Sequence, residues 1–131
     1  MPSPDLAAAP PASKALHIAL WVAQALLAAA FFMAGGLKLL GPEEGLPVPV
    51  LLARFIGAAE IAGSIGLIAP ALSRIKPVLT PIAAGCLALV MVLATGFHLS
   101  RGEPPAPTAL LGALALFVAW GRGWKARIAA A

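Results

Sequence analysis

Arg54 and Glu60 are ionisable residues inside the apolar stretch from Val50 to Ala69, and Glu60 lies ten residues into it. Because a helix rises about 1.5 Å per residue, its carboxylate is expected about 15 Å deep in a hydrocarbon layer about 30 Å thick. A charged side chain at this depth costs about 2.5 to 3.5 kcal/mol on insertion scales, so its presence indicates a specific role. These residue types favour ligand binding, proton transfer or a polar clamp between helices.

Three further polar residues are expected in the same half of the membrane. Lys38 ends the first apolar stretch, and Thr95 and His98 lie near the end of the third. Arg54 and Glu60 point about 120° apart around a helix, so Glu60 needs a hydrogen-bond donor from another helix: Lys38, His98 or Thr95. The predicted ligand-binding residues, which would hold an anion or a quinone headgroup, are Lys38, Arg54, Glu60, Thr95 and His98.

Simpler roles are open for the same residues. Arg54 and Glu60 are also explained by a structural clamp that fixes helix packing. Lys38 is also explained without a ligand, if its alkyl chain extends along the helix and brings the ammonium to the membrane surface. His98 is also explained without a ligand, if its ring forms hydrogen bonds in the headgroup layer.

The sequence lacks the residue sets of several common active sites, and no catalytic residue is predicted. A single cysteine, Cys86, cannot supply the thiol pair of a dithiol-disulfide oxidoreductase. His17 and His98 are expected at opposite membrane faces, so they cannot share a metal or a haem. No metal or haem is therefore expected. These residues leave the cofactor unknown, with a quinone as one candidate.

The composition indicates that these residues lie in a lipid bilayer. Of the 131 residues, 61% are hydrophobic and 11% are charged, whereas soluble proteins have about 45 to 50% apolar residues. Helices satisfy their own backbone hydrogen bonds, so they can bury this sequence in lipid. We predict an all-α protein with a flexible tail over 1–14 and one transmembrane four-helix bundle over 15–127, its helices at roughly 16–40, 50–69, 77–99 and 107–124.

The distribution of basic residues sets the expected orientation, because basic loops stay in the cytoplasm. They gather in the N-terminal region, the second loop and the C-terminal region, where the tryptophans also lie, whereas the first loop carries Glu43 and Glu44. Both termini are therefore predicted to be cytoplasmic in a multi-pass protein of a cell membrane, expected to be a bacterial inner membrane. The net charge of +4 then reflects topology, and no nucleic-acid partner is expected. The basic residues are Lys14, Arg74, Lys76, Arg122, Lys125 and Arg127, and the tryptophans are Trp21, Trp120 and Trp124.

Small residues on the second helix indicate a face that packs against protein. Gly57, Glu60 and Ser64 follow i, i+3, i+7 spacing, and small residues let membrane helices approach closely. Glu60 is therefore expected to face protein and not lipid. The predicted helix-packing residues are Gly35 on the first helix and Gly57, Gly63, Ser64 and Gly66 on the second.

Three segments share an order and spacing with a known family. They are an Ala-Gly-x-x-Lys-Leu helix end at 34–39, an Arg-x-x-Gly-x-x-Glu-x-x-Gly-x-x-Gly-Leu helix at 54–67, and His98 at the end of the third helix. With these segments the chain resembles the DoxX-like family of small four-helix membrane proteins. The resemblance implies that fold, and it implies that the shared polar and small positions are Lys38, Arg54, Glu60, Gly63 and His98. It implies no single activity, because the family includes a subunit associated with thiosulfate:quinone oxidation, members linked to redox partners, and receptor assembly chaperones.

Three functions remain open. The favoured one is a non-catalytic accessory or small-ligand-binding subunit of a redox-related membrane system, such as a subunit of a quinone-linked oxidoreductase with a redox protein as partner. The second is an assembly or scaffold protein for a partner membrane protein. The third is a proton-coupled carrier in which Glu60 titrates, and it would need a homo-oligomer because four helices enclose little volume.

Overall fold

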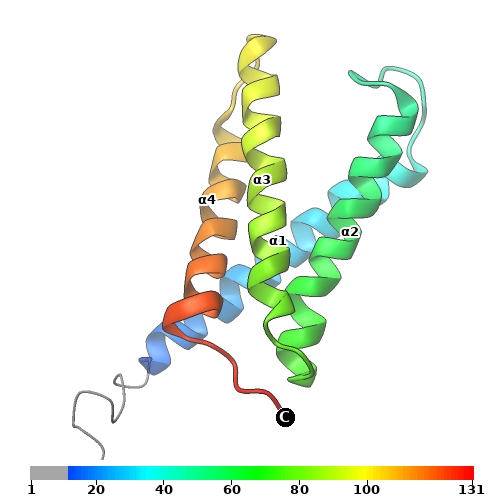
Figure 1. Cartoon of the computed structure of the whole chain (residues 1–131). Helices are drawn as coiled ribbons and strands as arrows, with labels where there is room; N and C mark the ends of the chain where they lie inside the picture. Colours follow the sequence, from blue (N-terminus) through cyan, green and yellow to red (C-terminus); the bar gives the residue numbers. More distant parts are fainter. Residues whose placement is uncertain (1–11) are drawn as a thin grey trace, which may run out of the picture.

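The computed structural model describes residues 12–131, which form four long helices (Figure 1). α1 spans Lys14–Leu40, α2 Val50–Ser73, α3 Leu79–Ser100 and α4 Ala106–Trp120, and a π-helical turn, η1, follows at Gly121–Lys125. All four helices, with α4 and η1 taken together, are long and apolar enough to cross a membrane. The predicted all-α four-helix transmembrane bundle is therefore confirmed. Residues 1–11 of the predicted tail lie outside the described residues.

The end of α2 shows how a hydroxyl from a neighbouring helix lets a helix pass a proline. The helix continues beyond Ala69, the predicted end, to Ser73, with Pro70 inside it. Because proline has no N–H group, the carbonyl of Gly66 loses its partner within the helix. Thr80 Oγ1 of α3 donates a hydrogen bond to that carbonyl at 3.0 Å. The hydroxyl replaces the missing backbone bond and joins α2 to α3.

The helices form two antiparallel pairs, α1 with α2 and α3 with α4, which diverge toward one end of the molecule (Figure 1). The α1–α2 and α3–α4 loops lie at the diverging end, which we call the loop end. The start of α1, the α2–α3 turn and η1 lie at the opposite end, which we call the terminal end. Close contacts between the pairs lie toward the terminal end, where Gly66 meets Ala83 and Gly121 meets Leu20.

The buried core draws on every helix. It includes Leu27 and Phe31 of α1, Leu67 of α2, Leu87 of α3 and Val118 of α4. Large apolar side chains also cover the outside of the bundle, and an exposed apolar surface of this extent is typical of contact with lipid. The protein is therefore a multi-pass membrane protein. Examples of these outward-facing residues are Phe32, Met33, Leu51, Phe55, Leu93, Leu110 and Leu116.

Candidate functional site

A glycine contact sets the distance between α1 and α2. A Cβ atom added at Gly35 would lie 2.6 Å from the carbonyl oxygen of Gly57, and one added at Gly57 would lie 2.7 Å from the carbonyl oxygen of Gly35. Real Cβ atoms do not approach backbone oxygens this closely, so only glycine fits at both positions. The two helix backbones are therefore in direct contact, as small residues permit in membrane helices.

Lys38 and Glu60 meet directly beside this glycine contact. Lys38 Nζ donates a hydrogen bond to Glu60 Oε1 at 2.6 Å. Side chains of an α-helix tilt toward its N-terminus, so in two antiparallel helices Lys38 leans into the bundle while Glu60 leans toward the loop end. Of the three candidate donors, Lys38 is therefore the one that reaches the carboxylate.

The two partners differ sharply in exposure. The side chain of Glu60 is 1% exposed, whereas that of Lys38 is 37% exposed. A lysine ammonium has three N–H donors, and Glu60 takes one of them. Within the part of the chain that the structure describes, no further hydrogen bond is formed by Lys38 Nζ. The buried carboxylate thus fixes the ammonium of a partly exposed lysine, and two of its donors are unused among the described residues.

Arg54 binds the end of α1. Its guanidinium donates through one terminal nitrogen to the carbonyl of Lys38 and through the other to the carbonyl of Gly41, the latter at 3.1 Å. The last carbonyls of a helix have no partner within it, so a cationic donor there stabilises the helix end. Arg54 also lies 3.9 Å from the exposed carboxylate of Glu43. It holds the backbone that carries Lys38 and adds a second positive charge beside it.

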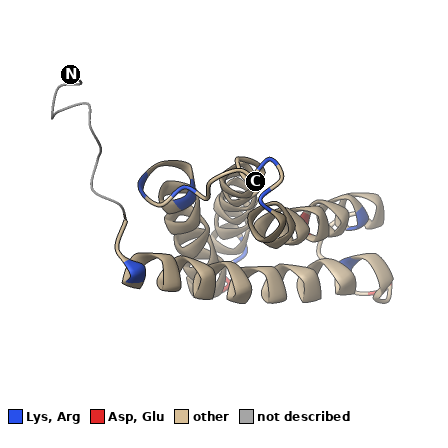
Figure 2. Cartoon of the chain, turned by 90° about the horizontal axis from the view of Figure 1, so that it is seen from below, with Lys and Arg blue, Asp and Glu red and all other residues tan. Residues whose placement is uncertain are grey.

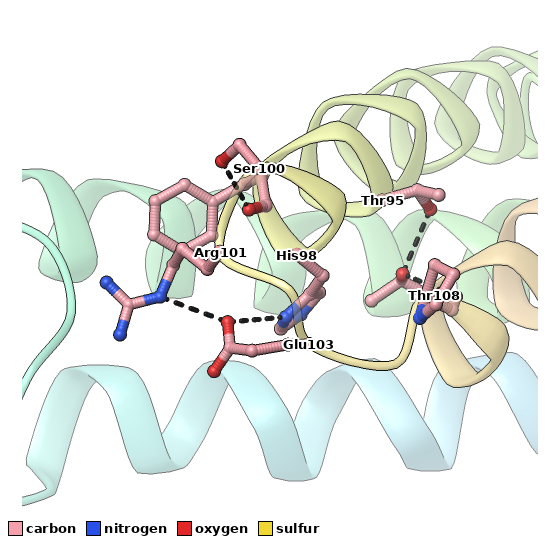
Figure 3. Close-up of polar contacts among 8 residues, drawn as sticks. Thr95, His98, Ser100, Arg101, Glu103 and Thr108 are labelled. Atoms are coloured by element: carbon pink, nitrogen blue, oxygen red, sulfur yellow. Dashed lines mark hydrogen bonds and ion pairs between the residues drawn. The ribbon is translucent and has the colours of Figure 1, made fainter.

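His98 belongs to a separate cluster at the α3–α4 loop (Figure 3). His98 Nδ1 donates to Glu103 Oε1 at 3.2 Å, and Arg101 Nε donates to the same oxygen at 3.1 Å. The hydrogen bond from His98 is the main cause that lowers the pKa of the Glu103 carboxyl; desolvation opposes it, and the charge and hydrogen bond of Arg101 lower the pKa further. The cluster closes the loop between α3 and α4.

Thr95 lies on the same helix pair and bonds to α3 and α4 (Figure 3). Its hydroxyl donates to the carbonyl of Met91 at 2.7 Å and lies 2.9 Å from the hydroxyl of Thr108. The five predicted ligand-binding residues thus fall into two groups. The first is Lys38, Arg54 and Glu60 on α1 and α2. The second is Thr95 and His98 on α3, and their hydrogen bonds go to α3, α4 and the loop between them.

The remaining small residues of α2 are Gly63 and Gly66, which contact α3, and Ser64, which bonds within α2. A Cβ atom at Gly63 would lie 2.7 Å from Leu87, and one at Gly66 would lie 2.8 Å from the Ala83 side chain. Ser64 is buried, and its hydroxyl donates to the carbonyl of Ile61 at 2.8 Å. Gly63 and Gly66 thus serve the α2–α3 contact, while Gly35 and Gly57 serve α1–α2.

A second polar group, which sequence reasoning did not propose, lies at the terminal end. Gln24 and Arg122 are both buried, and Arg122 Nε donates to Gln24 Oε1 at 2.7 Å. Gln24 Nε2 in turn donates to the carbonyl of Leu67 at 2.7 Å. From the sequence, Arg122 was interpreted only as one of several basic residues at the cytoplasmic boundary of the membrane. The one available signal was Gln24, a polar residue in an apolar stretch that needs a buried partner.

Metal ligation has no support among residues 12–131, where no three His, Cys, Asp or Glu side chains are grouped to hold an ion. Among the described residues, two buried side chains carry charged groups: Glu60, which bonds to Lys38 between α1 and α2, and Arg122, which bonds to Gln24 between η1 and α1. These observations define a polytopic helical membrane protein with charged groups inside a four-helix bundle.

Comparison with known proteins identifies the family. Residues 22–121 match the sequence model of the DoxX-like family, and the chain belongs to that family. No curated protein and no solved structure matches the chain. Lys38, Arg54, Glu60 and His98 all lie within the matched residues.

Proposed function

We propose that this protein is a non-catalytic accessory subunit of a redox-related membrane system, and that Lys38, Arg54 and Glu60 bind an anion or a quinone headgroup. The partly exposed side chain of Lys38, with two donors of its ammonium unused among the described residues, is the observation that carries the proposal. Its side chain is 37% exposed although it belongs to an apolar bundle, and its contact with the buried Glu60 uses one of three donors. The remaining donors suit an oxyanion or the carbonyl oxygen of a quinone.

Two features of the cluster support binding. Lys38 and Arg54 place two positive charges beside the buried carboxylate of Glu60 and the exposed carboxylate of Glu43, and the unused donors of Lys38 suit negative charge or electron-rich oxygen. The bond to Glu60 also fixes the Lys38 side chain before a ligand arrives, which lowers the entropy lost on binding. Charge-assisted hydrogen bonds of this kind are roughly twice as strong as neutral ones.

Thr95 and His98 were predicted to share the same site. Thr95 bonds to Thr108 and His98 bonds to Glu103, so both side chains already have partners on α4 and the α3–α4 loop. The proposal therefore assigns the ligand to α1 and α2. Direct contact of Thr95 or His98 with the ligand stays a prediction, which titration of the Thr95→Val and His98→Asn variants tests.

Thermal unfolding in a neutral detergent tests the proposed site. The probes are a short-chain quinone, thiosulfate and sulfite, each titrated against the wild type and against Lys38→Gln. A ligand at 100 times its Kd stabilises the folded state by about 2.7 kcal/mol. We expect at least one probe to raise the melting temperature of the wild type and to lose this effect in Lys38→Gln. Lys14→Gln, which removes an exposed lysine at the start of α1, is the matched control and should respond like the wild type. Equal responses of the wild type and Lys38→Gln to every probe would refute the proposal.

A groove between α2 and α3 favours a second candidate function, the assembly of a partner membrane protein. The groove has a volume of about 540 Å³, and small residues, among them Ala59, Ala62, Gly66 and Ala83, make up about half of its apolar lining. Small residues admit the backbone of another transmembrane helix. Ala62→Leu would fill the groove and should reduce co-purification of a bound membrane protein, whereas Ala58→Leu, exposed on α2 beside it, should not. Equal co-purification with both variants would refute this function.

Orientation is a further part of the proposal. We expect the terminal end in the cytoplasm, because the basic residues gather there (Figure 2). A C-terminal alkaline phosphatase fusion in a bacterial host should therefore be inactive, while a C-terminal green fluorescent protein fusion should fluoresce. The reverse pattern would place the termini outside.

A further inference from the structure

We propose that the terminal end of the bundle contains a second binding site, in which Arg122 and Arg127 bind the phosphate group of an anionic ligand. A cavity of about 410 Å³ lies between the start of α3 and the residues that follow α4. Pro77, Val78 and Pro81 line one side of it, and Arg122, Arg127 and Ile128 line the other. The inference does not depend on the proposed role of Lys38, which lies toward the loop end.

Arg122 is buried with two of its five donors unused. Arg122 is 3% exposed. Nε donates to Gln24 Oε1 at 2.7 Å, and one terminal nitrogen donates to His17 Nδ1 at 2.9 Å and to the carbonyl of Ala126 at 3.0 Å. The other terminal nitrogen is buried without a hydrogen-bond partner among the described residues. Buried polar groups are nearly always paired, so this nitrogen points to a missing acceptor.

The charge of Arg122 is also unbalanced. Its three hydrogen-bond acceptors are an amide oxygen, an imidazole nitrogen and a backbone carbonyl, none of which is an anion. The ion pairs of the described residues involve Lys38, Arg54, His98 and Arg101, all on the loop-end side of the bundle. A buried charge is costly unless it is paired with an opposite charge. An anionic ligand in the adjoining cavity supplies that pair.

The local backbone positions both arginines at the cavity. Arg122 lies in the π-helical turn η1, and such turns frequently occur at functional sites. Arg127 Nε donates to the carbonyl of Gly123 at 2.7 Å, and its two terminal nitrogens form no hydrogen bond within residues 12–131, which leaves them for a ligand. The chain after η1 is tied to the end of α2, because Arg74 Nε donates to the carbonyl of Ala129 at 2.8 Å. This segment forms a fixed wall of the cavity.

The surroundings favour a phosphate group over other anions. The Arg122 guanidinium carbon lies 5.4 Å from the centroid of the Trp21 ring, and Trp124 beside it is exposed. Indole rings at a helix end are typical of the headgroup layer, where lipid phosphates lie. Figure 2 shows basic residues around the C-terminal segment at this end. Arginine donors match the geometry of phosphate oxygens, and basic pockets between helices bind anionic headgroups. The ligand is a phosphate monoester or diester, either free or as part of a lipid.

The test compares two phosphate sources by thermal unfolding of the whole protein. Inorganic phosphate is titrated in neutral detergent at constant ionic strength, and phosphatidylglycerol is titrated into phosphatidylcholine nanodiscs. The variants are Arg122→Gln, Arg127→Gln and the matched control Lys125→Gln, which removes an exposed charge outside the cavity.

We expect phosphatidylglycerol to stabilise the wild type and Lys125→Gln alike. Arg127→Gln should weaken the apparent affinity about tenfold, the effect of one charge-assisted hydrogen bond, and Arg122→Gln should lose the response. Stabilisation by inorganic phosphate as well would identify free phosphate as a ligand, and stabilisation by the lipid alone would identify a headgroup. The inference is overturned if neither source stabilises the wild type, or if Arg127→Gln and Lys125→Gln behave alike. Arg127 is exposed, so its variant decides the question even if Arg122→Gln does not fold.

Discussion

Replacing Lys38 by methionine should destabilise the protein by leaving Glu60 buried without its partner. The carboxylate is 1% exposed and bonds to Lys38 at 2.6 Å, so the variant leaves an uncompensated charge between α1 and α2. Breaking a buried ion pair from one side costs about 3 to 5 kcal/mol. Because Lys38 is itself 37% exposed, we expect the lower end of that range, about 3 kcal/mol.

The double variant Lys38→Met/Glu60→Met separates this effect from loss of packing. Replacing both members of a buried pair by apolar residues is often neutral, so the double variant should unfold within about 1 kcal/mol of the wild type. The free energy of unfolding is measured by titration with sodium dodecyl sulfate in mixed micelles, with Lys14→Met as the control for loss of an exposed charge. The reasoning is refuted if Lys38→Met is as stable as Lys14→Met, or if the double variant is less stable than Lys38→Met.

Three further predictions follow from the helix contacts and the loop cluster. Gly57→Ala should cost about 1 to 3 kcal/mol, because its Cβ atom meets the backbone of α1, whereas Gly36→Ala, with open space around it, should cost nothing in the same unfolding titration. Arg54→Gln should cost about 1 to 3 kcal/mol through lost hydrogen bonds to the end of α1, measured in the same way. The pKa of Glu103 lies below its ordinary 4.5 because His98 and Arg101 bond to it, so its contribution to stability is present above that pH and is lost as the pH falls further. The melting temperature of the wild type should therefore decline more steeply on acidification than that of Glu103→Gln, and parallel curves would contradict the role of this cluster.

The fold could be predicted from the sequence because four apolar stretches separated by turn residues leave few alternatives in a bilayer. The end of α2 could not, because Pro70 normally stops a helix and the compensating donor, Thr80, comes from another helix. Such a contact is visible only once α2 and α3 are placed side by side. The local sequence thus predicts the four helices, whereas the C-terminal end of α2 depends on a contact with α3.

The polar residues were found from the sequence, but their grouping was not. The sequence left three candidate donors for Glu60, and the opposite tilt of side chains in two antiparallel helices brings Lys38 to it. His98 was expected in the same half of the membrane as Lys38, yet depth does not specify which helices pair, and Glu103 on the adjoining loop is its partner. Arg122 was taken as a boundary residue because sequence position cannot show that η1 turns it into the bundle.

The most direct test of the central claim is a solid-state NMR measurement of the Lys38–Glu60 contact in lipid, with and without a ligand. The claim is that buried Glu60 holds the ammonium of the partly exposed Lys38 as a binding group. A bond of 2.6 Å between Nζ and Oε1 predicts a measurable through-space dipolar coupling between ¹⁵Nζ of Lys38 and ¹³Cδ of Glu60. It also predicts a shift of the Lys38 ¹⁵N resonance when quinone, thiosulfate or sulfite is added. Absence of the coupling, or a Lys38 resonance that none of these ligands changes, would contradict it.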